Sequence, residues 1–177
     1  KNVRGLIFAE QEAGYLAGVA AATVSRSNVI GSVGGLKIPP VDAFIAGYRA
    51  GARATKRNIR HLNGYSQDFV AQDKCKEVAT NQIQEGADVI FQVAGQCGLG
   101  ALSAARENSV WGVGVDADQG YIGPHVLTSA QKKVDVAIFT TIAQVKNGTF
   151  RGGANTLLNV KNKGVGYGRI SARAPKT

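Results

Sequence analysis

Short apolar runs alternate with longer segments that are apolar on one side only, and this alternation continues along most of the chain. Runs with the length and composition of buried strands cover residues 3–9, 28–33, 88–94, 110–115, 126–128 and 156–160. Segments with apolar positions at helical spacing cover residues 10–24, 41–56, 70–85, 101–107 and 132–147. The polar run 58–64 fits a further strand less well. The pattern therefore predicts alternating strands and helices.

Helical connections between successive strands favour a parallel sheet, because a parallel pair needs a long crossover. We expect an α/β, three-layer unit with a mainly parallel sheet of about five or six strands and helices on both faces. Residues 1–166 would form this single lobe, followed by a basic C-terminal tail, 167–177. We expect the basic, glycine-rich stretch 161–177 to be poorly anchored. The last helix should turn its apolar positions inward; these are Val134, Ile138, Ile142 and Val145.

The bulk composition fits an ordinary globular domain, with 44% of the 177 residues apolar and 19% charged. This length allows one full-sized core and hardly two. No run approaches the roughly 18 apolar residues of a membrane-spanning helix, so we expect no transmembrane segment. The first ten residues lack the long apolar region and the cleavage pattern of a signal peptide.

Basic residues exceed acidic ones, which gives a formal net charge of +9. Asp135 is the last acidic residue, so the end of the chain is uniformly basic. A second basic stretch shares one helix face and comprises Arg49, Arg53, Lys56 and Arg57. Such patches suit an anionic polymer or a lipid head group, although a solvated surface explains them more simply. No nucleic-acid motif accompanies them.

The two cysteines, Cys75 and Cys97, give little information about function. They do not form a CxxC pair, and they do not cluster with the two histidines in the sequence. We therefore expect no metal site and no cofactor. Two free thiols are the favoured interpretation, and a single disulfide is the alternative.

The segment 87–119 carries the most chemistry. An apolar strand enters a glycine-rich turn that contains Gly95 and Gln96, a short helix follows, and a second strand ends at Asp116 and Asp118. The carboxyl ends of parallel strands are where such sheets bind ligands. Glycines there let backbone N–H groups approach a ligand next to a helix N-terminus. A tight turn without a ligand is the alternative.

Asp116 and Asp118 could act as paired carboxylates in acid–base chemistry or bind a metal, since alternation places both on one face. No third ligand or positioned histidine supports this. A carboxylate that accepts hydrogen bonds from ligand hydroxyl groups fits better, and a cap or salt bridge is the alternative. Phe91 fits the core better than a stacking platform. No nucleophile motif such as GxSxG occurs, so we expect no enzymatic activity.

Five motifs, in order, resemble those of the basic membrane protein family: FAEQEAGYLAG, VGGLKIPPVDAFIAGYRAGA, GADVIFQVAGQCGLG, GVDADQ and VLTSAQKKVDVA. The resemblance covers residues 1–166. Members of this family are nucleoside-binding lipoproteins of ABC importers with a type I periplasmic-binding-protein fold. The resemblance implies a non-catalytic, extracytoplasmic module that binds a purine or pyrimidine nucleoside and serves a membrane permease.

The resemblance also implies roles for individual residues. Asp116 matches the carboxylate that binds ribose, Lys132 matches a ribose-binding lysine, and Phe91 matches an aromatic that stacks on the base. Gln96 stands where the family usually has a second glycine, and Cys97 where it often has threonine. The family's N-terminal region, with its lipidated cysteine and much of its first lobe, has no counterpart in this sequence. The alternative is an interaction or structural protein that kept the fold, lost transport and binds an anionic partner through its basic patches.

Overall fold

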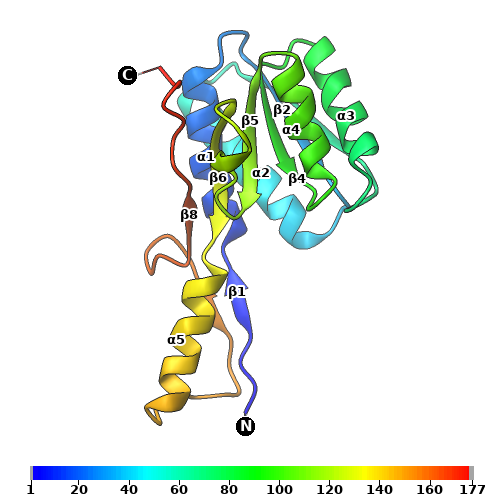
Figure 1. Cartoon of the computed structure of the whole chain (residues 1–177). Coiled ribbons are helices and arrows are strands. Elements are labelled where there is room, and N and C mark those ends of the chain that lie inside the picture. Colours follow the sequence, from blue (N-terminus) through cyan, green and yellow to red (C-terminus); the bar gives the residue numbers. More distant parts are fainter. Residues whose placement is uncertain (1, 176–177) are drawn as a thin grey trace.

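Two β-sheets of unequal size organise the chain in the computed structural model, which describes residues 2–175 (Figure 1). The larger sheet has the strand order β3-β2-β4-β5-β6-β8, and the smaller one pairs β1 with β7. The strands are β1 Leu6–Phe8, β2 Val29–Gly34, β3 Arg60–Tyr65, β4 Val89–Val93, β5 Trp111–Asp116, β6 Val126–Lys132, β7 Thr156–Leu158 and β8 Val165–Tyr167. Only β8 runs antiparallel within the larger sheet, so the predicted mainly parallel sheet is confirmed.

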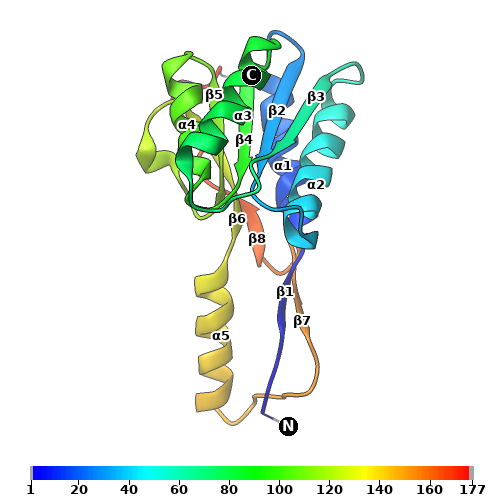
Figure 2. The same cartoon turned by 90° about the vertical axis from the view of Figure 1, so that its right-hand side faces the viewer.

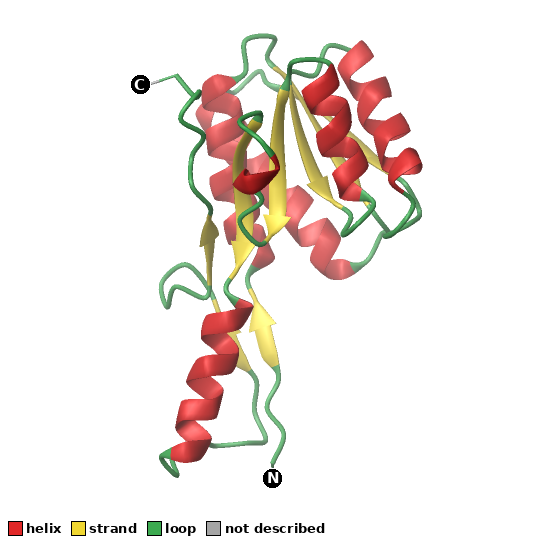
Figure 3. Ribbon diagram, viewed as in Figure 1, coloured by secondary structure: helices red, strands yellow, loops and turns green. Residues whose placement is uncertain are grey.

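Helices cover both faces of the larger sheet and complete the predicted three layers (Figures 2 and 3). Helices α1 (Glu10–Val24) and α2 (Pro39–Thr55) pack on one face, where Phe44, Tyr48 and Phe91 form the centre of a core. Helices α3 (Gln72–Gln84) and α4 (Gly98–Glu107) cover the other face over Val33 and Ile90. We call the six-stranded sheet with α1–α4 the large lobe.

Helices α1 and α2 pack unusually close together, and glycine is what permits it. A Cβ atom at Gly14 would lie 2.1 Å from the carbonyl oxygen of Phe44, and one at Gly18 would lie 2.0 Å from that of Tyr48. No side chain fits within such distances of a backbone oxygen. The glycine and alanine content of the first helix therefore reflects this contact between helices.

The second, smaller body consists of β1, β7 and α5 (Val134–Lys146) and extends below the large lobe (Figure 2). We call it the small unit. Ala137 is the one buried residue of α5, whereas Phe139 is 75% exposed and Ile142 61% exposed. The prediction that α5 turns its apolar positions inward is wrong for this chain, since all four are exposed; they are Val134, Ile138, Ile142 and Val145.

Three crossings join the two bodies: residues 8–10, 132–134 and 158–165. Backbone hydrogen bonds tie them to one another. The Ala9 N–H group donates to the Leu158 oxygen at 2.8 Å, and the Lys133 N–H group donates to the Gly164 oxygen at 2.9 Å. A Glu12 carboxylate oxygen accepts a further bond from the Val160 N–H group at 2.7 Å. The crossings therefore form one connected structure.

The end of the chain is held along β6. Strand β8 pairs with β6, and the predicted boundary between residues 166 and 167 falls inside β8. Beyond it, the Gly168 N–H group donates to the Ser129 oxygen and the Ser171 N–H group to the Leu127 oxygen, both at 2.8 Å. The expectation of a poorly anchored tail is therefore wrong for these residues. Residues 176 and 177 lie outside the described part.

A disulfide joins Cys75 on α3 to Cys97 in the turn before α4, with their Cα atoms 5.5 Å apart. Both cysteines are fully buried. The favoured interpretation of two free thiols is therefore wrong. Sequence could not decide this point, because the 22-residue separation says nothing about whether the two elements pack together. The disulfide fixes the glycine-rich turn to the neighbouring helix.

Candidate functional site

The carboxyl ends of β4, β5 and β6 face the small unit (Figure 1). Except for Phe91, the sequence-predicted site residues lie at or just after these strand ends. Asp116 is the last residue of β5 and stands opposite Gln131 in the register with β6. Lys132 directly follows Gln131 and is the last residue of β6. This strand is longer than the predicted strand 126–128. A concavity of about 360 Å³ lies here and is lined by both residues.

Asp116 has an unusual environment for a carboxylate at a strand end. Its φ of +63° lies in the left-handed region, so the chain turns sharply after β5. The residue keeps an exposed surface, yet surrounding protein partly buries the carboxyl group, and this burial raises its pKa. The Lys132 ammonium group opposes that effect, whereas the Glu10 carboxylate adds to it. Asp116 therefore combines a ligand-accessible position with restricted hydration.

Lys132 is held from two sides by groups from the first crossing. Its ammonium nitrogen lies 3.4 Å from a carboxylate oxygen of Glu10 and 5.2 Å from the centre of the Phe8 ring. Both charged side chains are largely buried, with 22% and 14% of their surface exposed. A buried cation between a carboxylate and an aromatic face has little freedom to move. The lysine is therefore positioned before any ligand arrives.

Glu10 and Phe8 were not singled out from the sequence as site residues. They lie more than 100 positions from Asp116, and only the fold brings them to Lys132. A usable signal existed for Glu10, because it directly follows the apolar run 3–9, as Asp116 follows the run 110–115. The same rule about strand ends could have found Glu10, whereas Phe8 lies within its run.

Asp118 supports the loop after β5 and does not pair with Asp116. Its carboxylate accepts hydrogen bonds from the Gly120 N–H group at 3.1 Å and the Arg169 N–H group at 3.2 Å. The Arg169 guanidinium nitrogen lies 3.7 Å away. Asp118 also lines the rim of the concavity. Within residues 2–175, no group of three His, Cys, Asp or Glu side chains could hold a metal ion.

The glycine-rich turn presents Gly95 and Gln96 to solvent at the end of β4. Gly95 has a φ of +56°, which favours glycine. The turn is anchored from behind, since the Cys97 N–H group donates to the Phe69 oxygen at 3.0 Å and the disulfide holds its side chain. The exposed side of the turn is therefore rigidly presented.

Phe91 does not take part in this site. Its side chain has no exposed surface, and its ring centre lies 4.9 Å from that of Tyr48 and 6.3 Å from that of Phe44. It lies in the middle of β4 and packs under α2. A base cannot stack on a fully enclosed ring, so the family-based role for Phe91 is wrong and the core interpretation holds.

A buried amide network beneath the strand ends was also not predicted. The Gln92 side-chain amide donates to the Gln119 side-chain oxygen at 2.6 Å, and that oxygen also accepts from the Val115 N–H group at 3.0 Å. The Gln119 N–H group donates to the Ser129 hydroxyl at 3.0 Å. The network links β4, β5 and β6 directly behind Asp116. Satisfied buried polar groups make such a site rigid.

Comparison with known proteins identifies a family. Residues 1–174 match the Bmp family model, described as ABC transporter substrate-binding protein PnrA-like. The chain is 36% identical to the ABC transporter nucleoside-binding protein BmpA of Lactococcus lactis subsp. cremoris (strain MG1363), with 97% of this chain and 54% of that protein covered. It is 35% identical to basic membrane protein D of Borreliella burgdorferi (strain JD1), with 94% and 50% covered.

The fold has close counterparts among solved structures. An ABC transporter system solute-binding protein from Aeropyrum pernix K1 superposes with a TM-score of 0.86 at 30% identity, covering 95% of this chain and 50% of that one. The chain therefore spans about half the length of the relatives it matches. Within residues 2–175, no helix is long and apolar enough to cross a membrane. Motifs, fold and sequence similarity agree, and the chain belongs to the Bmp family of ABC transporter substrate-binding proteins.

Proposed function

We propose that this chain forms one side of the nucleoside-binding cleft in the substrate-binding protein of an ABC importer. The observation that carries the proposal is that Asp116 and Lys132 lie at the ends of two adjacent strands, with Lys132 already held in place by Glu10. Family membership supports it, and so does the Lactococcus lactis relative, whose name describes it as nucleoside-binding. Transport then needs no chemistry from this chain, only reversible binding.

Ribose recognition follows from the charges at this edge. The Asp116 carboxylate can accept two hydrogen bonds from vicinal hydroxyl groups, and a charged acceptor makes the stronger bonds. The Lys132 ammonium group donates to the same sugar and offsets the Asp116 charge. Glu10 keeps Lys132 in place. Asp118 acts indirectly in this scheme, because its oxygens already support the loop.

The base lies toward the glycine-rich turn in this proposal. Gly95 lets the ligand approach the backbone closely, and the Gln96 amide offers both a donor and an acceptor to a base edge. A glutamine at a close-approach position also narrows the space for the base. We therefore expect Gln96 to influence which bases are accepted.

This chain alone should bind nucleosides weakly. The concavity is open, and the matched relatives are about twice as long, so contacts on the far side of the ligand belong to sequence outside this chain. Affinity depends on how completely a ligand is enclosed. The test is calorimetry with adenosine, guanosine, inosine and uridine. No binding of any of them at millimolar concentration would overturn retained nucleoside recognition.

A matched variant makes the calorimetry specific to the proposed site. Asp135 lines the same concavity and carries the same charge as Asp116, but it lies in the first turn of α5. Asp135→Asn should leave nucleoside binding nearly unchanged. If it weakened binding as much as Asp116→Asn, a general charge effect would replace the proposed contact.

We further propose an extracytoplasmic location and a membrane permease as the partner. The disulfide supports this location, because disulfides persist in oxidising compartments. Two observations about relatives also support it: the family description and the name basic membrane protein D. Protein recovered from intact cells only in the cytosolic fraction, with both thiols reduced, would contradict the proposal.

A second candidate function is binding of an anionic polymer or lipid through α2. Arg49 and Arg53 are exposed on α2 and Arg57 in the turn that follows it, which favours this candidate. Lys56 is different, since its ammonium group donates to the Ser25 oxygen at 2.6 Å. Retention on a heparin column should fall with added salt and with the triple Arg→Gln variant. Retention unaffected by both changes would rule out this candidate.

A further inference from the structure

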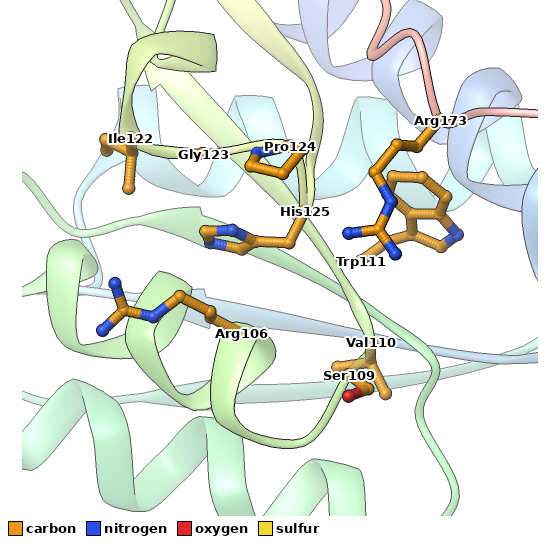
Figure 4. A pocket seen from close by; sticks show the side chains of 9 residues that line it. All are labelled: Arg106, Ser109, Val110, Trp111, Ile122, Gly123, Pro124, His125 and Arg173. Atoms are coloured by element: carbon orange, nitrogen blue, oxygen red, sulfur yellow. The ribbon is translucent and has the colours of Figure 1, made fainter.

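A second concavity, of about 400 Å³, lies at the opposite end of the larger sheet from Asp116 (Figure 4). It is formed where β5 and β6 begin, between the end of α4 and the C-terminal segment. Trp111 begins β5 and Asp116 ends it, so the two sites are separated by roughly 16 Å along the strand. Its volume falls within the range of roughly 300–1,000 Å³ typical of small-molecule pockets.

Two arginines from separate parts of the chain line this pocket. Arg106 projects from the last turn of α4, and Arg173 from the C-terminal segment (Figure 4). Neither forms an ion pair within residues 2–175, and no acidic side chain of that range lines the pocket. Two like charges beside one cavity repel each other, so an anion between them would relieve that repulsion.

Arg173 is held in this position by the segment around it. The Ser171 hydroxyl group donates to the Pro124 oxygen at 2.7 Å and accepts from the Arg173 N–H group at 3.3 Å. The Ser171 N–H group donates a hydrogen bond to the Leu127 oxygen on β6. The arginine is therefore presented by an anchored loop.

His125 is a further polar residue at this pocket, and its Nε2 atom is itself covered by protein. Its side chain lines the cavity but is only 9% exposed, and its Nε2 atom has no hydrogen-bond partner. Burial, followed by the Arg106 guanidinium group, lowers the pKa of His125, and Arg173 adds to this while the Leu102 carbonyl group partly offsets it. Buried polar groups without a partner are rare in proteins.

An apolar wall completes the pocket. Trp111, Ile122 and Pro124 line it beside the two arginines (Figure 4). Figure 4 shows the guanidinium groups of Arg106 and Arg173 on opposite sides of the His125 ring. Cations together with a flat apolar surface fit a ligand that has both an anionic group and a planar body. An inorganic ion alone would leave the wall unused.

We propose that this pocket is a second ligand site, which binds a small organic anion through Arg106 and Arg173 and holds its planar body against Trp111. The anionic group is a carboxylate or a phosphate monoester, because both accept the paired N–H groups of arginine. This site is independent of the proposed nucleoside site. The two share only strands β5 and β6.

Trp111 makes the proposal directly testable, because it is the single tryptophan of the chain. Its fluorescence should change saturably on titration with phenyl phosphate or benzoate at low ionic strength. Benzamide, which has the ring without the charge, should cause no change at ten times the concentration. Inorganic phosphate should bind at least tenfold more weakly than phenyl phosphate. Added salt should weaken both organic anions.

Variants identify the groups that bind. Arg106→Gln and Arg173→Gln should each weaken phenyl phosphate roughly tenfold to hundredfold, the effect of losing a hydrogen bond to a charged group. Arg151→Gln, which changes an exposed arginine in the loop between α5 and β7, should have no effect. In NMR spectra the imidazole signals of His125 should move and its pKa should rise when the anion binds, while those of His61 stay constant.

The proposal fails under any of four results. The first is an equal response to benzamide, which would indicate apolar contact only. The second is binding that persists in the Arg106→Gln/Arg173→Gln double variant, which would place the anion elsewhere. The third is no saturable response to either organic anion at tens of millimolar. Phosphate that binds as tightly as phenyl phosphate would contradict the role of the Trp111 wall.

Discussion

The large lobe buries its helix α4, whereas the small unit leaves the more apolar helix α5 exposed. Helix α4 buries six of its ten residues against the sheet and α3, whereas α5 buries only Ala137 out of thirteen. Phe91 in the large lobe is fully enclosed, and Phe139 on α5 is 75% exposed. The difference shows that an apolar helix pattern predicts which face seeks a partner. It does not show that the partner is in the same chain.

The largest expected effect tests this contrast with one residue type. Phe91→Ala should lower the free energy of unfolding by about 3–5 kcal/mol, because it opens a cavity in the core. Phe139→Ala, its matched control, should change it by less than about 0.5 kcal/mol, as expected for an exposed position. Urea unfolding followed by circular dichroism measures both. Similar losses would mean that another surface, such as a second copy, covers α5 in solution.

The disulfide should give the next largest effect. It closes a segment of 22 residues within the large lobe, and a closure of this length contributes about 3 kcal/mol. Cys75→Ala/Cys97→Ala should lose about that amount, and reduction of the unaltered protein should reproduce the loss. Hydrogen exchange should accelerate around α3 and the glycine-rich turn, not in α5. A double variant as stable as the oxidised protein would contradict the contribution of the disulfide.

Asp116 lies where the large lobe meets the small unit, so an Asp116 variant tests whether a ligand binds at this place. If a ribonucleoside binds, Asp116→Asn should weaken it by about 1.5–3 kcal/mol, the range for hydrogen bonds to charged groups. A 2′,3′-dideoxynucleoside lacks the hydroxyl groups and should respond much less. Calorimetry with both ligands measures the difference. Equal losses would show that Asp116 supports the loop and does not contact the sugar.

The smallest effect concerns pH and is confined to the large lobe. Burial, and then Arg49 and Arg53, lowers the pKa of His61 to about 4 from 6.5. The unfolded chain therefore takes up a proton first as the pH falls, and the free energy of unfolding should decrease between pH 6.5 and 4. We expect about 1–2 kcal/mol, because the imidazole is only partly enclosed.

His61→Asn should reduce this pH dependence without removing it, since the pKa of His125 is lowered as well. Urea unfolding at several pH values measures the slope. A variant with an unchanged slope would show that His61 is not responsible for the effect. A steeper slope would mean that the asparagine exposes another titrating group.

Much of the fold was predictable because local patterns determine it. The order of strands and helices follows the apolar periodicity, and helical crossovers require parallel strands. Strand β8 escaped prediction because three residues in a glycine-rich segment carry too little pattern. The exposure of α5 could not be predicted for a different reason. Apolar periodicity shows which side of a helix is apolar, but not which element of the chain covers that side.

The candidate site was predictable where it follows strand ends and not where it depends on packing. Asp116 directly follows the apolar run 110–115, whereas Lys132 was singled out through the family resemblance; both lie at the expected edge. Phe91 also had the right residue type, but its place in the middle of β4 buries it. The contact between Glu10 and Lys132 and the Gln92–Gln119 network required distant segments to meet, which no local pattern encodes.

The three crossings have a mechanical consequence. Each is only a few residues long, apart from the third, and hydrogen bonds join them side by side. Any swing of the small unit against the large lobe must be absorbed as φ and ψ changes in these segments. Because these hydrogen bonds couple the crossings, a change in one crossing must be accompanied by changes in the others. Glu10 lies on the first crossing and Lys132 on the second, so a movement of the small unit against the large lobe strains their ion pair. A ligand that holds Lys132 in place would therefore also restrict this movement.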